Sequence, residues 1–325
     1  MSTSSDWEIP HQAQPKPEDW AFDLERALAS VLTLRATVPA DAFTAGTLGT
    51  ERAGNGVLIR DDGIVLTIGY LITEADTIWL NTNDGRAVPG HALSYDQETG
   101  FGIVQALGRV TIPAVPMGRS ALVKVGDRVI VAGGGGRQRA VAAKVAAKQE
   151  FAGYWEYLLD EAIFTSPAHP NWGGAAVLAA DGTLVGIGSL HLQQGKENTP
   201  PDHLNMIVPI DLLPPILDDL LALGRPNHPP RPWLGLYATE VEDKIMVAGL
   251  TNAGPARRAG LKMGDVVLAV AGEEIADLAS LYRQIWRCGA AGARVPILVY
   301  RDGRTLDIEV KSGDRARFLK SPSLH

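Results

Sequence analysis

Ser166 and His169 are the residues whose types and spacing come nearest to nucleophilic catalysis in this chain. A serine attacks a carbonyl only when a neighbouring base takes its proton and a third group orients that base. Ser166 and His169 lie three residues apart in a predicted loop, and Ser189 follows further along. Asp160 and Glu161 could complete the set only if the loop folded back. We expect solvated loop residues here, with a relocated catalytic pair as the alternative.

Metal and phosphate chemistry have little support in the sequence. His91, His191 and His203 do not show metal-ligand spacing, and Cys288 is the single cysteine, which excludes a thiolate zinc site. Residues 133–137 (Gly-Gly-Gly-Gly-Arg) resemble a phosphate-binding loop but lack its Gly-Lys-Ser/Thr ending. We therefore expect neither a metal nor a cofactor.

The composition is that of a globular protein with two or three domains. The chain has 325 residues, of which 46% are hydrophobic and 21% charged. The net charge of −7 argues against a nucleic-acid-binding protein, which would carry a basic surface. No apolar run reaches the ~20 residues that span a bilayer, and no signal peptide is visible. The sequence as written predicts a cytoplasmic protein; a chain trimmed of its leader would look the same and be periplasmic.

Short apolar runs separated by turn residues follow Gly56. Two turn signals, residues 61–63 (Asp-Asp-Gly) and 83–85 (Asn-Asp-Gly), stand between such runs. Many short strands at this spacing indicate an all-β barrel or sandwich. The predicted strands include residues 57–59, 64–67, 77–80, 103–104, 129–131, 177–178 and 184–187.

A helix and a proline-rich segment then divide the chain. Leucines at helical spacing predict a helix that Asp211 caps at its start and Gly224 at its end. Four prolines within residues 225–232 make a stiff spacer. The predicted domains are a mobile segment (1–19), a barrel domain (20–224), the linker (225–232), an α+β module (233–311) and a tail (312–325).

Several short motifs occur in an order that is specific to one family. In the first part they are residues 54–59, 62–67, 83–86, 124–127, 181–187 and 207–210; in the second, residues 233–236, 254–261 and 263–267. From about Asn55 to Lys311 the chain resembles the HtrA/Deg family. The resemblance implies a mainly β fold, a trypsin-like double six-stranded β-barrel followed by an α+β PDZ domain.

The same resemblance places the catalytic triad at three residues that cannot perform its chemistry. The family's histidine follows Leu-Thr and two further residues, where this chain has Tyr70. Its aspartate follows an Asp-x-x-Thr turn, where this chain has Gly100. Its serine lies in Gly-Asn-Ser-Gly-Gly after a proline, where residues 170–174 supply Trp172 with one residue fewer before it.

Each replacement removes a separate part of the reaction. An indole cannot attack a carbonyl, and a phenol of pKa ~10 accepts protons poorly at neutral pH. Gly100 has no side chain to orient a base. The shortened loop also puts the oxyanion hole in doubt. Because loss of a whole triad removes about 10⁶ in kcat, we expect no proteolysis, and we expect Trp172 to lie buried in or beside the former cleft.

The second half keeps the parts of a peptide-binding domain. A PDZ domain adds a peptide as a strand to an open sheet edge, and backbone N–H groups of a loop hold the peptide carboxylate. We expect residues 233–236 to form that loop, residues 241–249 the edge strand, and the second helix the groove wall, with core packing as the alternative for the apolar residues. The predicted peptide-binding residues are Trp233, Leu234, Gly235, Leu236, Ile245, Leu278, Leu281 and Ile285.

The main hypothesis is a pseudoprotease that binds peptide termini or unfolded segments as a scaffold, chaperone-like holder or regulator. Two alternatives stay open. One is an active serine endopeptidase that uses displaced residues, and the other is a structural subunit that pairs with an active relative. The resemblance also implies a homotrimer built by the N-terminal segment, with Trp20 and Phe22 as candidate contacts.

Overall fold

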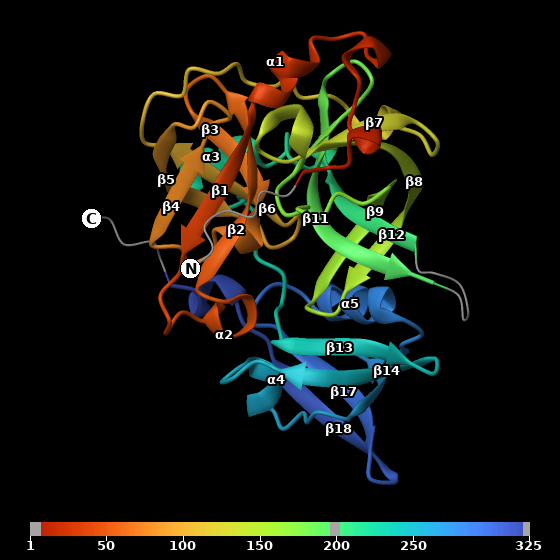
Figure 1. The fold of residues 1–325 in the computed structure, drawn as a ribbon. Helices are drawn as coiled ribbons and strands as arrows, with labels where there is room; N and C mark the ends of the chain where they lie inside the picture. Colours follow the sequence, from red (N-terminus) through yellow and green to blue (C-terminus); the bar gives the residue numbers. More distant parts are fainter. Residues whose placement is uncertain (1–7, 196–201, 321–325) are drawn as a thin grey trace. The chain divides into compact units, whose positions relative to one another are not determined.

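Short antiparallel strands make up most of the regular structure, as the apolar runs and turn residues predict (Figure 1). The computed structural model describes residues 8–195 and 202–320. By their contacts the described residues form two units, one with residues up to Gln149 and Glu161–Asn227, the other with Glu150–Asp160 and His228–Lys320. The predicted mainly β fold with two six-stranded barrels is confirmed.

The first barrel closes in the order β1-β2-β3-β6-β5-β4. The turn between β2 and β3 is the predicted Asp-Asp-Gly turn, and Gly63 adopts the left-handed φ of +90° that such a turn requires. Leu58, Leu66 and Ile103 are fully buried in the barrel. Its strands are β1 (Val31–Thr37), β2 (Glu51–Arg60), β3 (Ile64–Ile68), β4 (Thr77–Asn81), β5 (Ala87–Tyr95) and β6 (Phe101–Ala106).

The second barrel closes in the order β10-β11-β12-β9-β8-β7. Its interior is lined by branched aliphatic residues such as Val131, Val177 and Ile207. Two of its strands, β8 and β9, are long, and the residues that join their ends belong to the second unit. Its strands are β7 (Arg128–Ala132), β8 (Ala140–Gly153), β9 (Tyr157–Ser166), β10 (Ala176–Leu178), β11 (Leu184–Gln194) and β12 (Asp202–Pro209).

The helices of the first unit are short, and one differs from its prediction. They are α1 (Leu24–Ala29), α2 (Ala45–Leu48) and α3 (Leu217–Leu223). The helix predicted from Asp211 begins six residues later, after a 3₁₀ turn at Ile210–Leu212. Asp211 does not cap it; its carboxylate instead accepts the N–H of Ala121 at 2.9 Å. Gly224 does end the helix, with a φ of +72°.

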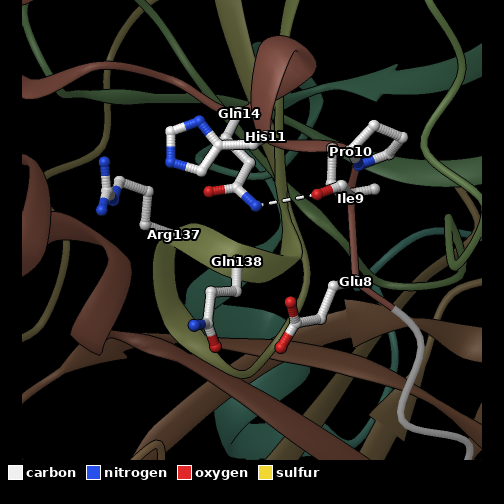
Figure 2. Close-up of a pocket in the computed structure, with 7 residues that line it drawn as sticks. All are labelled: Glu8, Ile9, Pro10, His11, Gln14, Arg137 and Gln138. Atoms are coloured by element: carbon white, nitrogen blue, oxygen red, sulfur yellow. Dashed lines mark hydrogen bonds between the residues drawn. The ribbon is translucent and has the colours of Figure 1, made fainter.

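Residues 8–19 of the predicted mobile segment are fixed on the second barrel, and residues 1–7 lie outside the described residues. Residues 8–19 carry two 3₁₀ turns, and Ile9 is buried in the apolar core of the second barrel, where its N–H donates to Gln138 O at 2.9 Å. Figure 2 shows the small polar pocket beside it, in which Gln14 Nε2 donates to Ile9 O at 2.7 Å. The free energy gained by burying the Ile9 side chain is enough to fix a segment whose polar composition had predicted mobility.

The second unit is an antiparallel sheet in the order β13-β14-β15-β17-β18. Its longer helix, α5, begins with a capping box between Asp277 and Ser280, and its apolar face packs into the core of the unit. The elements are β13 (Leu236–Val241), β14 (Lys244–Leu250), α4 (Pro255–Arg258), β15 (Val266–Val270), β16 (Glu273–Glu274), α5 (Leu278–Arg287), β17 (Arg294–Arg301) and β18 (Arg304–Lys311).

Two sequence predictions about this unit are corrected. The edge strand is β13, because β14, where we expected the edge, pairs with β13 on one side and β15 on the other. The unit also extends past the predicted end at residue 311, since Trp233 pairs with Gly313 and packs edge-to-face on Phe318.

Candidate functional site

The three predicted triad positions come together in the first unit. Tyr70 lies in the 3₁₀ turn Gly69–Leu71 that follows β3, and its hydroxyl donates to Ser189 O at 2.8 Å. A side-chain hydrogen bond joins the Tyr70 phenol to Trp172. The N–H of Gly69 donates to Gly100 O at 2.7 Å. The fold thus assembles this site from both barrels, with a phenol and an indole in contact at its centre.

The phenol of Tyr70 is held in its protonated form. Burial raises its pKa above the ordinary value, and the hydrogen bond with Trp172 offsets only part of that rise. Because an indole N–H can only donate, the bond runs from Trp172 to the phenol oxygen. Tyr70 therefore accepts one hydrogen bond and donates its own proton to a carbonyl, which leaves it unsuited to act as a base.

Trp172 is half-buried and begins a stack of three rings. Its indole lies on the imidazole of His191, with ring centres 5.1 Å apart and planes 25° apart. His191 stacks in turn on His203 at 5.0 Å, and His203 Nδ1 lies 3.0 Å from His191 Nε2. The indole, which we expected to be buried in or beside the former cleft, is thus only half-buried, with its ring stacked on His191.

The loop that carries Trp172 is tied to the first barrel by Asn55, which is fully buried. Asn55 Nδ2 donates to Asn171 O at 2.9 Å and to Gly173 O at 3.1 Å, and its Oδ1 accepts the N–H of Gly134 at 2.9 Å. Gly174 has a φ of +73°, and a Cβ there would lie 1.9 Å from Asn55 O. The second glycine after Trp172 is thus required by the close approach of two backbones.

His169 has a structural role in this arrangement. Its Nδ1 accepts the N–H of Asn171 at 3.1 Å, so Nε2 carries the ring proton, which points to Arg139 O at 2.9 Å. Burial lowers its pKa. Both ring nitrogens are thereby engaged with backbone groups, and the imidazole lacks the free lone pair that a base for Ser166 would need.

The two acids that could have completed a relocated site have other partners. Asp160 Oδ1 lies 2.6 Å from Arg283 Nη2 within the second unit. Glu161 Oε1 lies 2.8 Å from Lys148 Nζ within the first. Neither pair involves Ser166 or His169.

The predicted peptide-binding residues lie together in the second unit. Gly235, with a φ of +74°, turns the loop so that the N–H groups of Leu234 and Leu236 point the same way. Both donate to the side-chain carboxylate of Glu156. Ile245, Leu278, Leu281 and Ile285 are all buried in the apolar core of the unit. The loop N–H groups of Leu234 and Leu236 thus bind a carboxylate, here a side chain of the same unit, and the apolar residues serve as core.

Comparisons with known proteins agree with both halves of this architecture. The trypsin-like peptidase domain model matches residues 54–187, and the PDZ domain model matches residues 232–312. A probable periplasmic serine endoprotease, DegP-like, of Halomonas elongata is 27% identical over 275 residues, which cover 80% of this chain and 56% of the relative. The serine endoprotease DegS of Salmonella typhimurium is 23% identical over 313 residues, 90% of this chain and 85% of DegS.

The chain belongs to the HtrA/Deg family. Solved structures give the same fold: the HtrA-type protease AlgW with a tripeptide superimposes with a TM-score of 0.54 at 23% identity, over 92% of this chain and 97% of AlgW. A serine endoprotease from Yersinia pestis gives 0.53 at 21% identity, over 89% and 96%. This HtrA/Deg chain spans about half the length, 56%, of the DegP-like relative.

Some features of the HtrA/Deg chain escaped the sequence reasoning. Gln193 of β11 pairs with His203 of β12, so His191 and His203 are diagonal neighbours on one sheet face, which strand pairing could have revealed. The local sequence around Glu156 gave no sign that it would bind the loop.

Among residues 8–195 and 202–320, three or more His, Cys, Asp or Glu do not gather in a way that could hold a metal ion. In the same ranges each helix is too short or too polar to cross a bilayer.

Proposed function

We propose that this chain is a catalytically inactive HtrA/Deg-like protein that binds peptide C-termini or unfolded segments through its PDZ domain. The observation that carries the proposal is the contact between Tyr70 and Trp172 at the positions predicted for the base and the nucleophile. A protonated phenol that already donates to Ser189 O cannot accept a proton, and an indole has no nucleophilic oxygen.

The oxyanion hole supports the same proposal. In the trypsin-like mechanism, the N–H groups of the nucleophile and of the residue two positions before it bind the oxyanion. In this chain the second position is Pro170, which has no N–H. A tetrahedral intermediate would thus lose one donor, which alone costs about 10²-fold or more in kcat.

The test is incubation of the purified chain with unfolded casein and with a fluorophosphonate probe. We expect neither cleavage nor labelling. Cleavage that disappears in the Ser166→Ala variant would establish instead the rival function, a serine endopeptidase with displaced residues. His169 argues against that rival, because its ring nitrogens bind backbone groups.

Peptide binding would serve a scaffold, a chaperone-like holder or a regulator. The third candidate, a structural subunit, would be supported by co-purification with a relative that carries a complete triad.

We propose that the chain is located in the periplasm, because the DegP-like relative is named periplasmic, and cell fractionation tests this.

Homotrimer formation is part of the proposal. Trp20 and Phe22 pack edge-to-face with ring centres 6.0 Å apart, and the Arg128 guanidinium lies 4.8 Å from the Trp20 ring centre. We propose that this aromatic pair lies at the contact between copies. Light scattering should give three times the mass of 34.6 kDa, and a stable monomer would refute this point.

A further inference from the structure

Residues 150–160, which we call the tip, join β8 to β9 and lie in the second unit. Ala238 of β13 donates its N–H to Tyr154 O at 3.0 Å. β13 is the edge strand of the sheet: β14 pairs with one of its edges, and Tyr154 bonds to the other. A segment that hydrogen-bonds to this edge takes the place where a PDZ domain adds a peptide strand.

The tip is also anchored to α5, the helix on the other side of the groove. The hydroxyl of Tyr282, a fully buried residue, donates to Gly153 O at 2.7 Å. Leu158 is 8% exposed and belongs to the same apolar core as Leu278 and Leu281. The tip therefore contacts both walls of the predicted groove.

Glu156 reaches the carboxylate-binding loop itself. Its Oε2 accepts the N–H of Leu234 at 3.0 Å, and its Oε1 accepts that of Leu236 at 2.8 Å. The N–H of Gly235 contributes a further hydrogen bond to the same carboxylate. These are the donors that would receive the terminal carboxylate of a bound peptide, and a glutamate side chain presents the same chemical group.

The backbone at Glu156 is under strain. Its φ of +59° lies in the left-handed region that residues other than glycine seldom adopt, and the residue is 6% exposed. Such a conformation persists where the surroundings enforce it, and it is common at functional sites. Burial, strain and three backbone donors together distinguish Glu156 from an incidental surface contact.

We infer that the tip is an intramolecular ligand of the PDZ groove, in which the Glu156 carboxylate stands in for the C-terminus of a peptide. The inference rests on the proposed peptide-binding function and adds its regulation. An external partner needs a free C-terminal carboxylate, and it must displace the tip. Apparent affinity for such a partner is reduced by the fraction of molecules whose groove is open.

The experiment compares the full chain with Glu156→Gly, which removes the carboxylate and accepts the positive φ. Glu242→Gly is the matched control, because Glu242 is an exposed glutamate with a φ of +48°. The first readout is hydrogen exchange of the amides in residues 233–236. We expect exchange about tenfold faster or more in Glu156→Gly and unchanged exchange in Glu242→Gly.

The second readout uses twenty fluorescein-labelled decapeptides that differ only in their C-terminal residue, each with a free carboxylate or a carboxamide. The best free-carboxylate peptide should bind Glu156→Gly about tenfold or more tightly than the unaltered chain, and carboxamides should not bind. Equal amide exchange, or equal affinity, in the two proteins would overturn the inference.

Two further outcomes separate the inference from the proposed function. If the amides exchange faster in Glu156→Gly but no peptide binds either protein, the tip is an internal ligand and the peptide-binding function is wrong. If Glu156→Gly fails to fold, Glu156→Asn replaces it. Asparagine tolerates the positive φ, but its side chain is one methylene shorter and falls short of the loop N–H groups, so we expect the same changes, and their absence would overturn the inference.

Discussion

The predicted triad positions and the proposed peptide groove are both filled by the chain itself, but in different ways. At the predicted triad positions the side chains themselves are unsuited to catalysis: Tyr70 contacts Trp172, which lies on a loop that Asn55 ties to the first barrel. In the proposed groove the loop N–H groups are present, and by our inference the chain supplies Glu156 as their ligand. The Tyr70 and Trp172 side chains cannot leave, whereas a ligand can be displaced. The triad positions should therefore be rigid and inactive, whereas peptide binding in the groove should depend on pH and on substitutions in the tip.

The rigidity of the loop that carries Trp172 gives the largest expected effect. Gly174→Ala places a Cβ 1.9 Å from Asn55 O at a φ of +73°, so two backbones must separate. We expect a loss of at least ~4 kcal/mol in the free energy of unfolding, measured by urea titration. Gly85→Ala is the control, because its φ is +86° but nothing lies near the added methyl. It should cost only ~1 kcal/mol. Equal losses of unfolding free energy in the two variants would show that the Trp172 loop is not rigid, and would contradict the contrast drawn with the groove.

The response of the groove to pH follows from Glu156. Burial raises its pKa from 4.5 to about 7, while the loop N–H groups and the charge of Arg315 act in the opposite direction. The Tyr282 hydroxyl also faces the Glu156 carboxylate: burial raises the pKa of Tyr282, and the negative charges of Glu156 and Glu240 help to raise it further. The bound tip holds the proton more firmly than a released tip, so its stability is greatest below about pH 4.5 and falls as the pH rises through about 7.

Peptide affinity should accordingly increase between pH 5 and 8, by an amount that corresponds to at most ~3 kcal/mol. Fluorescence anisotropy with the best decapeptide measures it at each pH. Glu156→Gln has no titrating group at this position, and its affinity should stay flat. A rise of the same size in that variant would assign the pH response elsewhere.

A smaller effect is expected from Tyr282→Phe. Its hydroxyl donates to Gly153 O, and removal of one buried hydrogen bond costs ~1 kcal/mol. Peptide affinity should rise about fivefold as the tip is released more often. Tyr300→Phe serves as control, since Tyr300 is 46% exposed on β17. An unchanged affinity in Tyr282→Phe would mean that the tip is not held through α5.

The smallest effect should come from the ion pair at the base of the tip. Arg283 bonds to both Glu150 and Asp160, but these side chains are largely exposed, and exposed pairs contribute little. Asp160→Asn should change peptide affinity less than twofold. A change as large as that of Glu156→Gly would show that surface charge, rather than the buried carboxylate, closes the groove.

The sequence predicted the parts that depend on neighbours along the chain. The turn at Gly63 and the helix end at Gly224 follow from residue types with fixed backbone preferences, and both are found. The edge strand was predicted wrongly, because β14 became an interior strand through pairing with β15, whose paired residues lie 20 and 22 positions further along the chain. Asp211 failed as a cap because its carboxylate found Ala121 in another part of the barrel.

Glu156 was out of reach for the same reason. It lies 78 residues from Leu234, and nothing in its local sequence marks it as a ligand. Motif order could identify the PDZ loop, since that loop is continuous, but the partner comes from a strand connection in another part of the chain. Contacts of this kind depend on the folded structure and have no local sequence pattern.

The position of Leu158 affects which fragment of the chain can represent the PDZ domain. A fragment that starts at His228 would include every strand and helix of the PDZ domain, yet it would lack a leucine that is 8% exposed in the native core. A missing core leucine costs ~2–5 kcal/mol. Such a fragment would be less stable than the intact protein and would bind peptides more readily. Measurements on it would describe a different molecule from the one that the whole chain forms.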